Sequence, residues 1–98
     1  AKGLSDRAQQ LRADEGMLFL FEVPQESSFW MKRTFIPLQL IYIRPDGKVS
    51  QTHEMNPEPN PDQPKQYYSS QEKIIAAIEV APHTLKNYKD LQLCVHVR

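Results

Sequence analysis

The chain has 98 residues, with twelve Lys and Arg against twelve Asp and Glu and a formal net charge of zero. This length fits one domain, residues 1–98, and a neutral chain lacks the basic footprint of a nucleic-acid or anionic-membrane binder, so neither partner is expected. The single cysteine, Cys94, excludes an internal disulfide framework, and no apolar run has the length of a membrane span or the position of a signal peptide.

A short N-terminal helix is the first predicted element. Ser5 or Asp6 can cap its first turn, and apolar residues then recur at helical spacing as far as Arg12. Residues 17–21 follow as five consecutive apolar side chains between a glycine and a proline. That length and those flanks predict a strand that is buried on both faces.

A β-hairpin is the clearest local prediction. Residues 28–32 form an aromatic-rich candidate strand, and residues 38–43 are dense in β-forming side chains. The turn sequence Pro45-Asp46-Gly47 follows, in which proline presets one φ angle and glycine accepts a positive one. Residues 48–53 are therefore expected to run back antiparallel to residues 38–43.

The composition changes in the segment 56–70, which we interpret as a proline-rich loop. Four prolines fall between residues 56 and 64, and proline excludes both helix and central strand. Residues 74–80 then predict a strand, and residues 91–98 alternate with a period of two, which is typical of a half-buried strand. Six short strands with one N-terminal helix predict a mainly β, small single-domain β sandwich or barrel.

Several sequence blocks resemble a known family, the domain of unknown function 192 of bacteria and archaea. The order and spacing hold from Lys2 to about Val80, and the blocks that carry the resemblance are Lys2-Gly3-Leu4, Asp14 to Phe21, Phe29-Trp30-Met31-Lys32, Thr34, Ile36-Pro37-Leu38 and Asp46-Gly47. The resemblance implies a compact, mainly β domain with a short helix. It implies no particular reaction.

This chain departs from the family's pattern in four ways. Arg33 stands where the family usually has asparagine, Gln39 stands where it usually has aspartate, and the proline-rich loop lacks the two cysteines of many members. The strand that relatives usually place before the Gly-Leu block is also not expected here. Without that strand, the strand next to it would have unpaired N–H and C=O groups along an open edge. Pairing of this edge with a second copy predicts a homodimer as one alternative.

The leading site prediction is a face formed by Trp30, Lys32 and Arg33. An aromatic plane beside two cations suits an anionic or carbohydrate-like ligand, through stacking and charge-assisted hydrogen bonds. The structural alternative is that Phe29 and Met31 point into the core while Trp30 packs under the Lys32 stem on the other face. Both interpretations remain open at this point.

Tyr67 and Tyr68, at the end of the proline-rich loop, are placed beside that face. Four prolines lower the entropy cost of ordering a loop, which favours either a rigid pocket wall or a protein-docking surface. The alternative is a stiff surface connector. The leading function is therefore a module that binds an unidentified small molecule or protein.

Two further functions are kept as alternatives. One is a small enzyme acting on a carbohydrate or another polar metabolite, with Glu15, Lys32 and His53 as acid–base candidates, although no catalytic motif supports it. The other is an assembly module that pairs through the open edge. No cofactor is expected, because the three glycines are isolated and form no phosphate-binding loop.

A metal site is not expected either. Cys94 and His96 share one strand face, but a site needs three or four ligands. Only His53, His83 or Glu79 could complete it, and no spacing in the sequence brings them to the pair.

Overall fold

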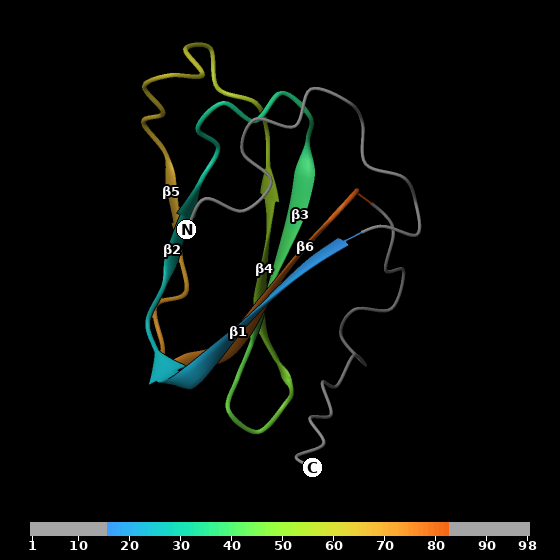
Figure 1. Ribbon diagram of the computed structural model, residues 1–98, viewed down its shortest axis with the longest axis vertical. Coiled ribbons are helices and arrows are strands. Elements are labelled where there is room, and N and C mark those ends of the chain that lie inside the picture. Colours follow the sequence, from blue (N-terminus) through green and yellow to red (C-terminus); the bar gives the residue numbers. More distant parts are fainter. Residues whose placement is uncertain (1–15, 83–98) are drawn as a thin grey trace.

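The computed structural model describes residues 16–82 as two antiparallel sheets (Figure 1). Four strands form the larger sheet in the order β1-β6-β3-β4, and β2 pairs with β5 in a separate two-stranded sheet. The strands are β1 (Gly16–Gln25), β2 (Ser28–Trp30), β3 (Leu38–Ile43), β4 (Val49–Met55), β5 (Tyr67–Ser69) and β6 (Ile74–Val80).

The hairpin prediction is confirmed. The strands β3 and β4 pair antiparallel, and the Gly47 N–H donates to the Arg44 carbonyl at 2.8 Å to close the turn between them. Gly47 has a φ of 88°, a backbone conformation that glycine adopts without steric cost. The strand after the turn begins at Val49 and continues to Met55, two residues beyond its predicted end.

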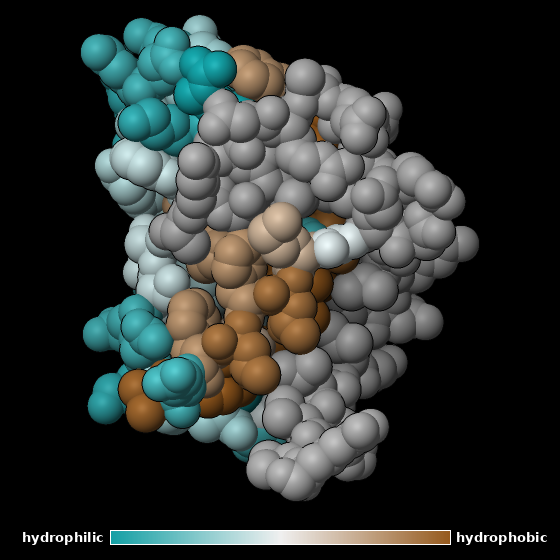
Figure 2. Space-filling view, in the orientation of Figure 1, coloured by the Kyte–Doolittle hydropathy of each residue, from teal (hydrophilic) through white to brown (hydrophobic). Residues whose placement is uncertain are grey.

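The expectation that β1 is buried on both faces is wrong. Its side chains alternate: Met17, Phe19 and Phe21 are half-buried against the core, whereas Leu18 and Leu20 are about half exposed, at 52% and 51%. Within residues 16–82, β1 pairs only with β6, so its apolar run does not have the two flanking strands of a central strand. Figure 2 shows hydrophobic residues gathered at the surface over this part of the sheet.

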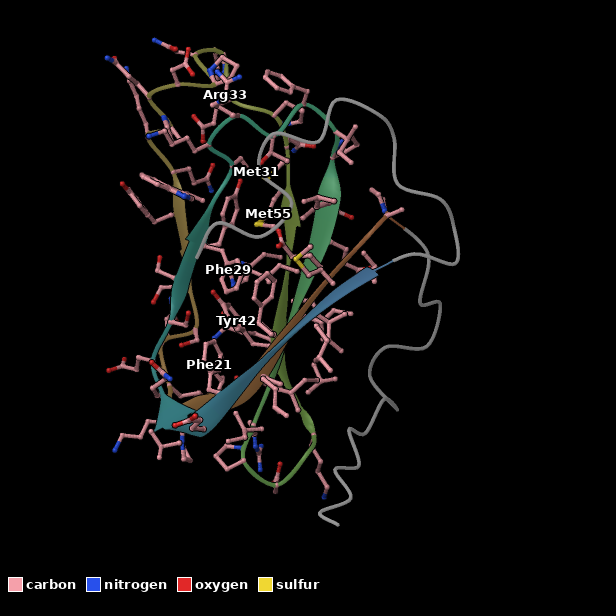
Figure 3. The ribbon with its side chains drawn as sticks, viewed as in Figure 1. Phe21, Phe29, Met31, Arg33, Tyr42 and Met55 are labelled. Atoms are coloured by element: carbon pink, nitrogen blue, oxygen red, sulfur yellow. The ribbon has the colours of Figure 1, made fainter. Side chains whose placement is uncertain are left out.

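The main core lies between the two sheets. Phe29 of β2 and Met31, which directly follows β2, point toward Tyr42 and Met55 of the larger sheet (Figure 3). These four side chains are at most 1% exposed. A second apolar cluster occupies the opposite face of the larger sheet and consists of Ile41, Ile43, Ala76 and Val80. Burial of both faces explains why five of the six side chains of β3 are apolar or aromatic.

The sequence interpretation is confirmed at the level of a small, mainly β fold, and the two sheets do not close into a barrel within residues 16–82. The strand β5 was not predicted, because its residues were assigned to the proline-rich loop. The predicted N-terminal helix and the strand 91–98 lie outside the described residues. In the part that is described, no helix has the length and apolar character needed to cross a membrane.

Candidate functional site

The outer face of the β2–β5 sheet carries a stacked aromatic pair. Trp30 lies opposite Tyr67 in the strand register, and their ring centroids are 5.6 Å apart with 27° between the ring planes. The Lys32 ammonium lies 5.4 Å from the centroid of the Trp30 ring. Trp30 is half-buried, whereas Tyr67 is 58% exposed, so much of the pair faces solvent.

The pleat of this sheet separates the two predicted tyrosines. Phe29 pairs with Tyr68, and both point inward with exposures of 1% and 7%. The structure therefore brings Tyr67 to the face of Trp30 and Lys32 but places Tyr68 in the core. The alternation of Phe29 and Met31 inward with Trp30 outward is the arrangement that the structural alternative described.

Arg33 follows β2 in a turn and anchors the proline-rich loop. Its backbone N–H donates to the Pro61 carbonyl at 2.7 Å, and its Nη1 lies 2.9 Å from Asp62 Oδ1. Its φ of 49° lies in the left-handed region, which is unfavourable for most side chains but better tolerated by asparagine.

The proline-rich loop is also held by its own side chains. The Glu58 carboxylate accepts hydrogen bonds from the backbone N–H groups of Lys65 and Gln66, at 3.2 and 3.3 Å. A turn bond joins the Gln63 N–H to the Asn60 carbonyl at 3.0 Å. Figure 2 shows hydrophilic residues gathered at this end of the molecule, where Figure 1 places the segment between β4 and β5.

His53 belongs to a polar cluster on the inner side of the two-stranded sheet. Its ring makes edge contacts with Tyr42 and Tyr68, at centroid distances of 5.9 and 5.7 Å. Its Nε2 is 2.8 Å from the Gln51 side-chain oxygen, while the Gln51 amide nitrogen donates to the Ser70 carbonyl. Because the Gln51 oxygen can only accept, Nε2 of His53 carries the proton.

Tyr42 connects this cluster to the core. Its hydroxyl donates to the Tyr68 carbonyl at 2.5 Å. Burial raises the pKa of Tyr42 far above its usual value, and the nearby Glu79 carboxylate adds to the rise. Burial also raises the pKa of Tyr68. Both phenols therefore remain protonated at neutral pH and act as hydrogen-bonding groups.

The three acid–base candidates are not brought together among the described residues. His53 contacts the inward-facing Tyr68, Lys32 lies over the outward-facing Trp30, and Glu15 lies outside the described residues. Cys94, His96 and His83 also lie outside them. Within residues 16–82, no group of three His, Cys, Asp or Glu side chains is placed to hold a metal ion.

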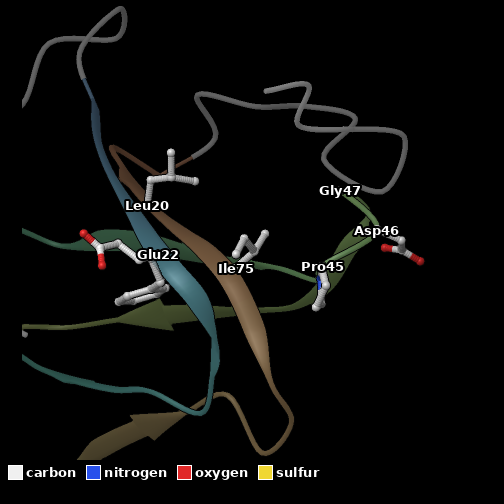
Figure 4. A pocket seen from close by; sticks show the side chains of 7 residues that line it. Leu20, Glu22, Pro45, Asp46, Gly47 and Ile75 are labelled. Atoms are coloured by element: carbon white, nitrogen blue, oxygen red, sulfur yellow. The ribbon is translucent and has the colours of Figure 1, made fainter. Parts of the chain in front are cut away.

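A pocket of about 410 Å³ lies at a different place, between β1 and the β3–β4 turn (Figure 4). It is lined by Leu20, Phe21, Glu22, Pro45, Asp46, Gly47 and Ile75, none of which was predicted as a site residue. The backbone N–H of Lys48, together with the Arg44 guanidinium, lowers the pKa of Asp46. Asp46 is therefore an ionised partner of its own turn rather than a proton donor for this pocket.

Sequence reasoning missed the cluster around Tyr42 and the pocket. Tyr42 lies in a strand whose six residues are all buried, so the sequence contains no alternation that would indicate which face it occupies. The pocket arises where the pairing of β1 with β6 is interrupted between Leu20 and Gln25. Only Pro24 hinted at that interruption, since proline cannot donate to a strand ladder.

The fold and the aromatic face define a small, mainly β domain with a solvent-facing Trp–Tyr pair. The model of the domain of unknown function 192 family, described as "Uncharacterized ACR", matches residues 1–90. The chain therefore belongs to this family, as its sequence blocks indicated. A search of curated proteins gives no match.

Two crystal structures resemble this fold. One is a protein from Sinorhizobium meliloti 1021 described as a proposed transcription regulator, with 32% identity, a TM-score of 0.71, and coverage of 87% of this chain and 62% of that chain. The other is a protein of unknown function from Novosphingobium aromaticivorans DSM 12444, with 29% identity, a TM-score of 0.67, and coverage of 82% and 54%. This chain spans less than two thirds of the length of either protein.

Proposed function

We propose that the chain is a binding module whose binding face is the outer surface of the β2–β5 sheet. The observation that carries this proposal is the stacked pair of Trp30 and Tyr67, flanked by Lys32 and exposed on a face that the core does not use. The inward residues Phe29 and Tyr68 supply the packing of this sheet. An exposed aromatic pair offers a large, rigid contact area to a ligand at a low cost in conformational entropy.

The position of the pocket favours binding over catalysis at this face. The residues that line the pocket belong to β1, β6 and the β3–β4 turn, so it lies away from Trp30 and Lys32. The titratable groups with raised pKa values, Tyr42 and Tyr68, point into the core instead. The stacked rings of Trp30 and Tyr67 suit recognition of a ligand by contact with an aromatic surface.

A thermal-shift screen with sugars, nucleotides, acidic metabolites and proline-rich peptides tests the proposal, because a ligand raises the unfolding temperature by mass action. The hits are then titrated by the fluorescence of Trp30, the single tryptophan of the chain. Tyr67→Ala is expected to weaken every hit. Phe35→Ala is the matched control, because Phe35 is also exposed, at 46%, but does not belong to the pair. A set of hits that ignores Tyr67→Ala contradicts the proposal.

Assembly is a second candidate function, supported by the apolar surface of β1. Leu18, Leu20 and Val23 are 51–62% exposed, and exposed apolar patches are typical of interaction surfaces. A second copy packed on this surface would cover them. The homodimer prediction concerned an open strand edge, and among the described strands β1 pairs only with β6. Light scattering tests this: a dimer mass that falls to one subunit in Leu20→Lys supports assembly, and a monomer mass at high concentration contradicts it.

The description of the Sinorhizobium protein as a proposed transcription regulator gives no reason to add nucleic acid as a partner. A DNA-binding domain works through clustered positive charge, and this chain has a net charge of zero. We therefore retain the expectation that the ligand is a small molecule or a protein.

A further inference from the structure

The turn between β3 and β4 contains the single Asp-Gly pair of the sequence, Asp46-Gly47, and no Asn-Gly pair occurs. An aspartate that precedes glycine can isomerise without an enzyme. Because glycine has no Cβ, its backbone nitrogen approaches the aspartate side chain without steric hindrance. The nitrogen then attacks that side chain to form a five-membered succinimide ring, which water reopens to isoaspartate. The sequence therefore places one isomerisation-prone bond in the hairpin turn.

The reaction needs a protonated carboxyl group and a nitrogen that gives up its hydrogen. The Gly47 nitrogen forms a bond to Cγ of Asp46, and the carboxyl hydroxyl leaves as water together with the hydrogen of that nitrogen. Water then adds to the main-chain carbonyl carbon of Asp46, and the bond from this carbon to the Gly47 nitrogen breaks. The chain now runs through the side-chain carbonyl, and the former main-chain carbonyl has become a carboxyl group. The water lost in the first step is replaced in the second, so no other reactant is consumed.

The fold holds both reacting groups in unreactive states. The Lys48 N–H donates to Asp46 Oδ1 at 3.0 Å, and Arg44 Nη2 donates to Asp46 Oδ2 at 2.5 Å. Both contacts lower the pKa of Asp46, so its carboxyl group is ionised at neutral pH and has no hydroxyl to lose. The Gly47 N–H donates to the Arg44 carbonyl at 2.8 Å, so the attacking nitrogen is also engaged.

Isomerisation would change the wall of the pocket beside this turn. Pro45, Asp46 and Gly47 line the pocket, where Figure 4 shows them across from Leu20 of β1. Isoaspartate inserts one extra carbon atom into the main chain, so it shifts the hydrogen bonds that close the hairpin. The side chains of Arg44 and Asp46 are 44% and 43% exposed, so solvent water reaches this bond.

We propose that Asp46-Gly47 is a site of isoaspartate formation, and that Arg44 restrains the reaction in the folded protein. Arg44 acts as a positioning residue, because it takes no part in the bonds that form and break. Its guanidinium holds the Asp46 carboxylate, and its carbonyl holds the Gly47 N–H. A substitution of Arg44 removes only the first of these contacts, since the backbone carbonyl remains. This inference does not depend on the proposed binding face.

The test follows isoaspartate at residue 46 by fragmentation mass spectrometry of the peptide that contains it, after incubation at neutral pH. The wild-type chain should form isoaspartate faster when it is unfolded in urea than when it is folded. Gly47→Ala should lose most of this reaction in urea, where folding has no influence and only the Cβ differs. An unfolded wild-type chain that forms no isoaspartate at residue 46 overturns the assignment of the site.

Under native conditions, Arg44→Gln should isomerise about two- to fivefold faster than the wild-type protein, the range that loss of an exposed ion pair allows. Arg33→Gln is the matched control, because it removes the exposed ion pair with Asp62, which precedes glutamine rather than glycine. It should form no isoaspartate at residue 62 and leave the rate at residue 46 unchanged. Thermal unfolding confirms that both variants fold.

The control separates the contact of Arg44 from general stability, because a general loss of stability would accelerate the reaction at residue 46 in both variants. Arg44→Gln that is no faster than the wild-type protein overturns the role of Arg44, and so does an equal acceleration in Arg33→Gln. A folded wild-type protein that isomerises as fast as the unfolded chain overturns the restraint by the fold.

Discussion

Replacing Arg33 by glycine and by alanine separates two contributions of this residue to stability. Both substitutions remove every contact of the guanidinium, including the ion pair with Asp62, whose side chains are 50% and 66% exposed. An ion pair at that exposure contributes about 0–1 kcal/mol. Both variants keep the backbone N–H that donates to the Pro61 carbonyl. They differ in how easily they adopt a φ of 49°.

The left-handed conformation costs roughly 1–2 kcal/mol for a residue with a Cβ atom and almost nothing for glycine. Glycine loses about 0.5–1 kcal/mol through the greater freedom of the unfolded chain. We therefore expect Arg33→Gly to be more stable than Arg33→Ala by about 0.5–1 kcal/mol. For a domain of this size, that difference raises the unfolding midpoint by about 2–8 °C.

Urea unfolding followed by Trp30 fluorescence measures the difference, and thermal unfolding by circular dichroism gives an independent value. Glu54 supplies the control, because it is exposed in β4 and is not among the residues with positive φ. There the order should be reversed, with alanine more stable than glycine. If glycine at position 33 is no more stable than alanine, the backbone explanation of Arg33 is refuted.

Four further predictions concern the core, two hydrogen-bonded groups and a buried amide. Met31→Ala should lose about 2–5 kcal/mol in urea unfolding, because Met31 is fully buried between the sheets, and a loss below 1 kcal/mol contradicts that packing. Because the pKa of Tyr42 is raised in the folded protein, the unfolded chain loses this proton first, and the free energy of unfolding should fall as the pH rises above 10. Tyr42→Phe should make the free energy of unfolding depend less steeply on pH in this range. An unchanged dependence refutes the role given to Tyr42. The lowered pKa of Asp46 has the opposite effect: its carboxylate stabilises the fold above pH 3.8, the ordinary pKa of aspartate, and this stabilisation is lost as the pH falls below that value. Asp46→Asn should therefore make the unfolding temperature depend less steeply on pH on the acid side. An equally steep dependence contradicts this. Gln39→Leu should stabilise the fold by about 1 kcal/mol in urea unfolding, because it removes the buried side-chain oxygen of Gln39, which lacks a hydrogen-bond donor among the described atoms. Destabilisation would show that this oxygen does accept a hydrogen bond.

Local chemistry explains which elements the sequence predicted. The β3–β4 hairpin depends on proline and glycine at fixed turn positions, so its sequence signal needs no distant contact. The strand β5 depends on pairing with β2, which is far away in the sequence, and its three residues are too few to show a period. The extent of burial of β1 was overestimated because an apolar run does not reveal how many neighbours a strand has.

The candidate site was predictable only in part, for a related reason. Trp30 and Lys32 are two residues apart, so an extended backbone places them on the same side. The sequence could not decide between Tyr67 and Tyr68, because adjacent strand residues face opposite ways and the register with β2 was unknown. The structure resolves this through the pair Trp30 and Tyr67.

The two substituted positions of the family's pattern differ in what they cost the fold. Arg33 is exposed, and its unfavourable feature is its positive φ. Gln39 is 9% exposed, and its Oε1 has no hydrogen-bond partner among the described atoms. A buried acceptor without a partner costs about 1–3 kcal/mol, and a buried aspartate would cost more unless a donor faced it. A polar group there works against stability, so position 39 is the better of the two places to look for a role beyond folding.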